Sequence, residues 1–287
     1  MDNRTAAVLG IRLSACASIR ALAVVVTLIL LSAPAHAAQI FVPSGASIGD
    51  AVARAVPGDE IVLEAGGVYT ELITLPDKGS GLPITLRSSA TLPERRIGPG
   101  DRSLLPSLGS GTTMAPITIT GSRWRLVGLA FRANSTGSGN IIDVIGTAAE
   151  VVIDRVLIEG GAQGQKRGVA MNGGGAITVT RSYVSNIWRT GQDSQALASW
   201  DGRGPFTITD NYLEAASENI MFGGADSSSE ARMPWVCAGI SLSRRVTVSV
   251  PPVSPRSCSE RPGPWPGCIG ALPCRFGSAK VDLPSPP

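Results

Sequence analysis

The chain has 287 residues, of which 43% are hydrophobic, 16% are charged and only 5% are aromatic. This length suits one sizeable domain better than two large ones. The formal net charge is only +3, and the sequence holds neither a basic block nor aromatic residues interleaved with basic ones, so nothing in it indicates a protein that binds nucleic acid.

Residues 1–37 have the features of a secretory signal peptide. Three arginines precede the apolar run ALAVVVTLILLSA, and the small-residue site PAHA ends at Ala37. The run is too short for a convincing membrane span. The stretch LSAC at 13–16 resembles a lipoprotein cleavage box, but it lies before the apolar run instead of after it. We therefore expect cleavage near Ala37, export to the periplasm or the medium of a bacterium, and no stable membrane span afterwards.

Export has a chemical consequence, because the single histidine, His36, lies inside the predicted signal peptide. The mature protein would contain no imidazole. Catalysis by a Ser-His-Asp triad, catalysis by a Cys-His pair and zinc binding through histidine are therefore excluded.

The first part of the mature chain predicts a short helix followed by strands. Apolar residues recur at helical spacing over 47–56, and Ser47 with Asp50 forms a capping-box pattern. The sequence PGD then ends the helix. Residues 60–75 read as two strands around a glycine turn, and 83–89 read as another strand. Residues 90–115 lack periodicity and predict a long loop or excursion.

From Pro116 onward a short phrase recurs about every 27 residues. Its apolar openings are NIIDVI, GVAMNG, QALASWD and NIMFGG, and its central strands are VVID, ITVT and FTIT. One copy cannot bury its own inward-facing apolar side chains, but the next copy can cover them. The sequence thus predicts an all-β fold, a parallel β-helix capped by the helix at 47–56. A β-sandwich would instead require two-residue hairpin turns.

Two stretches resemble a known class of proteins. SIGDAVARAVPGDEIVLEAGGVYTELITLPDKGSGLPITLRS resembles the amino-terminal cap and first turns of polysaccharide lyases related to chondroitinase B and alginate lyase, and GSRWRLVGLAFR resembles the start of their regular coils. Over roughly residues 39–226 the chain is similar to the pectate-lyase-like superfamily. The resemblance implies a right-handed parallel β-helix. It does not by itself imply that this chain has lyase activity, because one fold can carry many functions.

The repeat stops shortly after the phrase NIMFGGAD, and the predicted β-helix therefore covers 38–226. Residues 227–287 are rich in proline and hold four of the five cysteines, Cys237, Cys258, Cys268 and Cys274. Three hypotheses account for this segment. It is a disulfide-bonded appendage, a disordered proline-rich tail, or the product of a shifted reading frame that replaces later turns and their cap.

The resemblance implies a polysaccharide cleft along one parallel sheet and its adjoining loops. Stacking in register brings residues of successive copies to about 4.8 Å from one another. This selects residues in and beside the apolar openings. The candidates are Lys166, Arg167 and Arg189 for catalysis, Asn172, Gln192, Gln195, Trp200 and Asp201 for substrate binding, and Asp193 and Glu218 for a metal.

Such a set suits an extracellular acidic polysaccharide, cleaved by β-elimination. That reaction neutralises the sugar carboxylate, removes the C5 proton and protonates the leaving oxygen. We expect Lys166 as the base, Arg167 or Arg189 as the carboxylate clamp and Trp200 as a stacking platform. Calcium, held by Asp193 and Glu218, is the candidate cofactor. We expect a monomer.

Other interpretations of the same residues stay open. The chain could be a non-catalytic glycan-binding or surface scaffold β-helix, or a glycoside hydrolase using two of Asp193, Asp201 and Glu218. Lys166 and Arg167 could be solvated charges, and Trp200 a packed corner aromatic. Polar residues at the opposite bends are predicted to be structural: Asp154, Arg181, Asp210 and Asn211.

Overall fold

The computed structural model describes residues 37–109, 111–223, 248–249 and 274–277. Almost all of the predicted signal peptide and most of the segment 227–287, including Cys237, Cys258 and Cys268, lie outside the described residues. The chain divides into two units, 1–37 and 38–287, and the second unit is described below.

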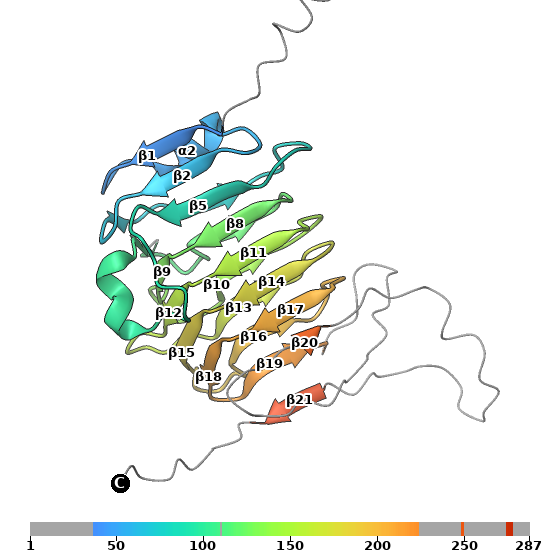
Figure 1. Cartoon of the computed structure of the whole chain (residues 1–287). Helices are drawn as coiled ribbons and strands as arrows, with labels where there is room; N and C mark the ends of the chain where they lie inside the picture. The colour runs from blue at the N-terminus through green and yellow to red at the C-terminus, as the bar shows by residue number, and fades with distance from the viewer. Residues whose placement is uncertain (1–36, 110, 224–247, 250–273, 278–287) are drawn as a thin grey trace, which may run out of the picture. The chain divides into compact units, whose positions relative to one another are not determined.

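The second unit is a parallel β-solenoid of about six turns (Figure 1). Three sheets run along it, and each full turn contributes one strand to each sheet. Among themselves, strands β1 to β19 pair in parallel with neighbours one turn apart, whereas β20 and β21 pair antiparallel with β17 and β19. The predicted parallel β-helix is confirmed.

The three sheets are called A, B and C here. Sheet A holds β1 (Gln39–Val42), β2 (Glu60–Leu63), β5 (Ile84–Ser88), β8 (Trp124–Val127), β11 (Val151–Asp154), β14 (Ile177–Thr180), β17 (Phe206–Thr209) and β20 (Val248–Ser249). Sheet B holds β3 (Val68–Tyr69), β6 (Ser107–Leu108), β9 (Ala130–Arg132), β12 (Leu157–Glu159), β15 (Tyr183–Ile187) and β18 (Tyr212–Ala215). Sheet C holds β4 (Ile73–Leu75), β7 (Ile117–Ile119), β10 (Asn140–Val144), β13 (Arg167–Met171), β16 (Gln195–Ser199), β19 (Glu218–Phe222) and β21 (Cys274–Gly277).

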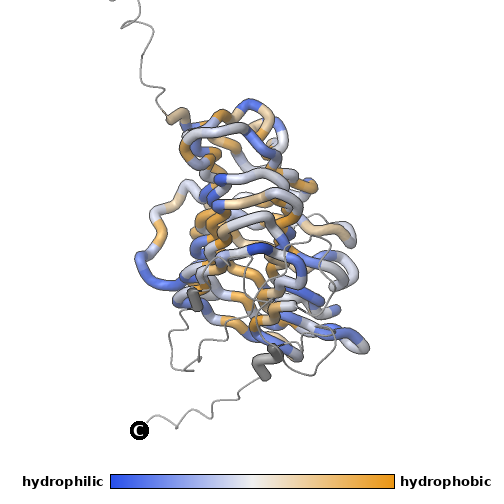
Figure 2. Tube along the Cα trace, turned by 90° about the vertical axis from the view of Figure 1, so that its right-hand side faces the viewer, coloured by the Kyte–Doolittle hydropathy of each residue, from blue (hydrophilic) through white to orange (hydrophobic). Residues whose placement is uncertain are grey.

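The core is a stack of apolar side chains in register. Ile153 of β11 pairs with Val179 of β14, which pairs with Ile208 of β17, and all three are buried. Figure 2 shows hydrophobic residues recurring along the successive turns. Full burial of such a side chain contributes about 1.5–3 kcal/mol, and it requires the neighbouring turn. The repeat in the sequence follows from this requirement.

The predicted capping helix is α2 (Ile48–Arg54), which packs against β1 and β4. The Ser47 hydroxyl accepts a hydrogen bond from the Asp50 amide at 3.1 Å, as the capping pattern predicts. Ile48, Ala51 and Val52 are buried, so the apolar face of the helix covers the first turn of the core. Within the described ranges, no helix has the length and apolarity to cross a membrane.

The excursion predicted for residues 90–115 is more ordered than a loop. It forms the 3-10 helix η1 (Pro99–Leu104) and the strand β6 of sheet B. Ile97 and Leu105 from this segment are buried against Ala130 and Leu157 on the outer face of sheet B. The excursion therefore shields one flank of the solenoid.

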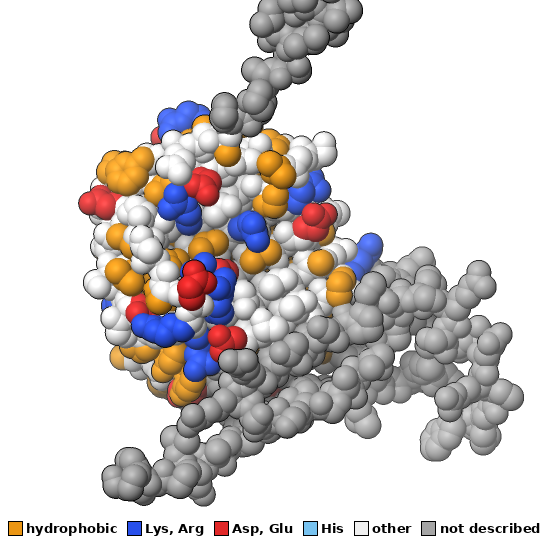
Figure 3. All heavy atoms as spheres, viewed as in Figure 1, with side chains coloured by type: hydrophobic (Ala, Val, Ile, Leu, Met, Phe, Trp, Pro, Cys, Tyr) orange, Lys and Arg blue, Asp and Glu red, His pale blue; other side chains and the backbone are white. Residues whose placement is uncertain are grey.

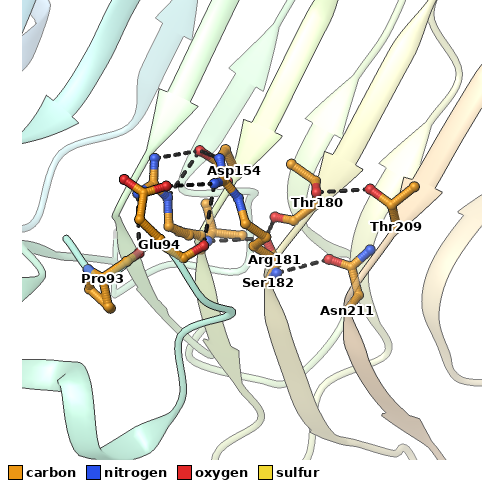
Figure 4. Close-up of polar contacts among 10 residues, drawn as sticks. Pro93, Glu94, Asp154, Thr180, Arg181, Ser182, Thr209 and Asn211 are labelled. Atoms are coloured by element: carbon orange, nitrogen blue, oxygen red, sulfur yellow. Dashed lines mark hydrogen bonds and ion pairs between the residues drawn. The ribbon is translucent and has the colours of Figure 1, made fainter. Parts of the chain in front are cut away.

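Ion pairs hold the excursion to the corner between sheets A and B (Figure 4). Asp154 accepts from Arg155 at 2.8 Å and from Arg181 at 2.7 Å. The same two guanidinium groups reach the excursion, where Arg155 donates to the Pro93 carbonyl and Arg181 faces Glu94 at 3.8 Å. Figure 3 shows basic and acidic side chains gathered on this side of the molecule.

The same corner confirms the structural role predicted for its polar residues. Arg155, Arg181 and Asp210 occupy equivalent places in successive turns, with φ of 51°, 50° and 52°, a left-handed backbone that permits the tight bend. Asn211 accepts from the Ser182 amide at 2.8 Å and donates to the Val179 carbonyl at 2.9 Å. These side chains satisfy backbone groups and charges of neighbouring turns.

Candidate functional site

The outer face of sheet C carries several of the residues predicted to be functional, and the order of inward and outward positions along β13 orients them. In β13, Val169 and Met171 belong to the core. A side chain at Gly168 would also point inward, because a Cβ there would lie 2.8 Å from Val184 of the core. With the second, third and fifth positions inward, the first and fourth positions, Arg167 and Ala170, face outward.

The outward first positions form a polar row across three turns. Arg167, Gln195 and Glu218 pair in register at the starts of β13, β16 and β19. The Arg167 Nε donates to Gln195 Oε1 at 2.8 Å, and the Gln195 Nε2 donates to Glu218 Oε2 at 2.8 Å. Gln195 and Glu218 are almost fully buried, so this row fixes the position of the Arg167 side chain from one side.

Trp200 fixes the Arg167 side chain from another direction. The guanidinium carbon lies 4.9 Å from the centre of the indole ring, a cation–π geometry. Burial lowers the pKa of Arg167, while Asp193, Asp143 and Glu218 oppose that shift. A guanidinium stays charged in a protein, so the lowered pKa means that this cation has lost part of its hydration and would gain from an anionic ligand.

Lys166 and Asp193 belong to the same charge cluster. Partial burial lowers the pKa of the Lys166 amine, the neighbouring Arg167 charge lowers it further, and Asp193 raises it. Lys166 precedes β13 and Asp193 lies in the loop before β16, so stacking of adjacent turns brings the two loops together. A lysine with a lowered pKa holds more of the neutral amine that can accept a proton.

Asp143 and Asn140 of β10 are members of this site that the sequence interpretation missed. They occupy the outward fourth and first positions of their strand, Asn140 in register with Arg167 and Asp143 with Ala170. Burial raises the pKa of Asp143, although Asn140 and Arg167 oppose that shift. The Oδ1 atoms of Asn140 and Asp143 are both buried with no hydrogen-bond partner. Buried acceptors without a partner favour binding of a ligand that carries hydrogen-bond donors, such as hydroxyl groups.

Three other predicted residues are not members of this charge cluster. One supports the backbone turn that carries Trp200, and two lie in the loop before β16. The Asn172 side chain accepts from the backbone amides of Trp200 at 3.0 Å and Asp201 at 3.2 Å. It thus shapes the turn that presents Trp200. Arg189 reaches back to the loop that lies two turns earlier, where a Cβ added to Gly137 would be 2.9 Å from its Nη1. Gln192 is exposed in the loop before β16.

The predicted calcium ligands do not form a typical calcium site. Calcium takes about six to eight oxygen ligands, whereas Glu218 already accepts from Gln195 and lies in the polar row beside the Arg167 cation. Among the described residues there is no group of three or more His, Cys, Asp or Glu side chains that could hold a metal ion. Calcium binding by Asp193 and Glu218 stays a prediction, and no step of the mechanism below passes through it.

Comparison with known proteins gave one structural similarity. No family model and no curated protein matches the chain. The chain is similar to the crystal structure of alginate lyase from Paenibacillus sp. str. FPU-7, with a TM-score of 0.46 and 19% sequence identity. The match covers 63% of this chain and 60% of that chain. The chain therefore spans less than two thirds of the length of that lyase.

Proposed function

We propose that the outer face of sheet C binds an acidic polysaccharide and cleaves it by β-elimination. The observation that carries the proposal is the half-buried guanidinium of Arg167, held by Gln195 and by the ring of Trp200. A guanidinium binds a carboxylate with two parallel hydrogen bonds, and the tryptophan ring beside it offers an apolar surface to a sugar ring. A uronate residue presents both partners.

In the proposed mechanism, Arg167 neutralises the carboxylate of the sugar and so makes the C5 proton more acidic. The neutral amine of Lys166 takes that proton. The electron pair of the C5–H bond forms the C4–C5 double bond, and the bond from C4 to the leaving oxygen breaks. Asp143, whose pKa burial raises, is the candidate that returns a proton to the leaving oxygen.

A specific observation favours a second function, glycan binding without cleavage. The outward fourth positions of β13 and β16 are Ala170 and Ala198, so these two positions offer no polar group to a substrate. A non-catalytic β-helix would use the same Arg167 and Trp200 to hold the polysaccharide. A glycoside hydrolase, which would use two of Asp193, Asp201 and Glu218, has no comparable support.

The proposed setting follows from the predicted signal peptide. Cleavage near Ala37 would deliver a monomeric protein to the periplasm or the medium, where acidic polysaccharides occur. Amino-terminal sequencing of the exported protein is the test. A first residue at or near Ala38 supports the proposal, whereas an intact Met1 in the cytoplasm contradicts it.

The activity is tested with alginate, pectate and chondroitin as substrates. Elimination produces an unsaturated uronate, which absorbs in the ultraviolet. We expect absorbance to grow with one of them for the unmodified chain, and to stop growing for Lys166→Ala. Lys78→Ala is the matched control, because Lys78 is only partly exposed, as Lys166 is, and donates only to the Ala53 carbonyl among the described contacts.

Three outcomes separate the alternatives. Growth of absorbance that Lys166→Ala abolishes supports the lyase. Retardation of the protein in gels that contain the polysaccharide, without new absorbance or new reducing ends, supports the binding protein. Reducing ends that appear without absorbance indicate a hydrolase and contradict the proposal.

A further inference from the structure

A hollow lies on another flank of the solenoid, on the outer face of sheet B. It has a volume of about 440 Å³, within the range of about 300–1,000 Å³ typical of ligand sites. Its polar lining residues are Arg102 of η1, Arg132 of β9, Glu159 of β12 and Asn186 of β15. We call this the sheet B hollow.

The charges in the sheet B hollow do not balance. Arg132 and Glu159 are in register on adjacent strands, and they would ordinarily pair. Instead, Glu159 forms its ion pair with Arg102, which the excursion brings to it. The Arg132 guanidinium turns away toward Gly109, where an added Cβ would lie 3.1 Å from its Nε. The hollow therefore contains two guanidinium groups against one carboxylate.

Arg132 is exposed, and within the described part of the chain it has neither an ion pair nor a side-chain hydrogen bond. A partly exposed aromatic, Trp188, is hydrogen-bonded to Asn186, one of the residues that line the hollow. The Trp188 indole donates to Asn186 Oδ1 at 2.9 Å and is 37% exposed. Asn186 is held in turn, because its amide donates to the Gly160 carbonyl at 2.5 Å. The hollow thus contains the Arg132 cation, and the indole of Trp188 is hydrogen-bonded to its lining residue Asn186.

We propose that the sheet B hollow is a second glycan site, which binds a carboxylate-bearing sugar through Arg132 with Trp188 beside the sugar ring. The excursion creates the site, because Arg102 occupies the carboxylate that would otherwise neutralise Arg132. This site would anchor an acidic polysaccharide independently of sheet C. It needs no cleavage, so it is compatible with either function proposed for the sheet C face.

The test is affinity electrophoresis of the full chain in gels that contain alginate, with dextran as a neutral polysaccharide. The background is Arg167→Gln, so that the sheet C face contributes little. We expect Arg132→Gln in this background to raise the dissociation constant for alginate about tenfold, the size of a lost charge-assisted hydrogen bond. We expect Arg132→Lys to retain part of the affinity and dextran to cause no retardation in any variant.

Arg125→Gln is the matched control. Arg125 is also exposed, lies on β8 of sheet A and carries the same charge. Equal weakening by Arg125→Gln and Arg132→Gln would show that only net charge matters and would overturn the proposal. Unchanged retardation for Arg132→Gln would overturn it as well, provided that circular dichroism shows a folded protein.

Discussion

The guanidinium of Arg167 lies 4.9 Å from the ring centre of Trp200, which follows the strand of the next turn. These residues are 33 positions apart in sequence, and the solenoid makes them neighbours. The pair combines a partly dehydrated cation with an aromatic face, and the proposed binding of an acidic sugar depends on both.

Truncation of the aromatic partner should weaken substrate binding more than it slows the chemical step. We expect Trp200→Ala to raise KM several-fold, since the cation–π contact contributes about 1 kcal/mol and the sugar loses its stacking surface. Steady-state kinetics on the cleaved polysaccharide measure this. Phe41→Ala, which removes an exposed aromatic from β1, should leave KM unchanged. A fall in kcat alone would contradict the role given to Trp200.

The half-buried carboxyl group of Asp143 should cost stability when it ionises. Burial raises the pKa of Asp143 in the folded protein above its ordinary value of 3.8. The protonated form is therefore favoured by folding, and this stabilisation is lost as the pH rises through the folded-state pKa. We expect Asp143→Asn to melt at a higher temperature than the unmodified chain at pH 7.

The same substitution should make little difference below pH 3.8, where Asp143 is protonated in both states. Thermal unfolding followed from pH 3 to pH 8 tests the sign. A variant that melts at a lower temperature at pH 7 would show that Asp143 is stabilised as a carboxylate, and would remove it as a proton donor.

The corner between sheets A and B should be the part of the fold most sensitive to a single charge. Asp154 is buried and accepts from both Arg155 and Arg181. We expect Asp154→Ala to destabilise the protein by about 3–5 kcal/mol, because it leaves partly buried guanidinium groups without their partner. Denaturant unfolding measures the loss, and limited proteolysis should then cut residues 90–106.

Asp210→Ala supplies the comparison for this prediction. Asp210 faces Arg96 at 3.6 Å, and both side chains are substantially exposed, so its loss should cost no more than about 1 kcal/mol. Equal losses for the two variants would contradict the clamp role of Asp154.

Sequence reasoning predicted the solenoid, and it selected part of the charge cluster that lies on the outer face of sheet C. The repeat reveals which strands stack, and stacking alone brings Lys166, Arg167 and Asp193 into one charge cluster. Asp143 was missed because it lies inside the phrase NIIDVI, which reads as a buried apolar run. Two consecutive core residues, Ile141 and Ile142, break simple alternation, and only the register shows that Asp143 faces outward.

For residues 90–115 the sequence predicted only that the repeat is interrupted, and it did not predict how this excursion packs. Its buried side chains, such as Ile97 and Leu105, follow no helical or strand period. Its attachment depends on arginines far along the chain, as Arg181 facing Glu94 shows. No local pattern marks a contact over that separation, so neither the packing on sheet B nor the hollow beside η1 could be read from the sequence.

Metal dependence separates two ways of neutralising the sugar carboxylate. With Arg167 in that role, we expect a chelator such as EDTA to leave the initial rate of cleavage unchanged. Loss of activity in EDTA that added calcium restores, and that Asp193→Asn also produces, would instead support calcium held by Asp193 and Glu218.

The central claim is that the outer face of sheet C is where an acidic sugar binds. The most direct measurement is a crystal structure of the Lys166→Ala variant with an alginate oligosaccharide, since loss of the proposed base should leave the substrate uncleaved. We predict a sugar carboxylate within hydrogen-bonding distance of the Arg167 guanidinium and a sugar ring against Trp200. An oligosaccharide at saturating concentration that leaves this face empty would contradict the claim.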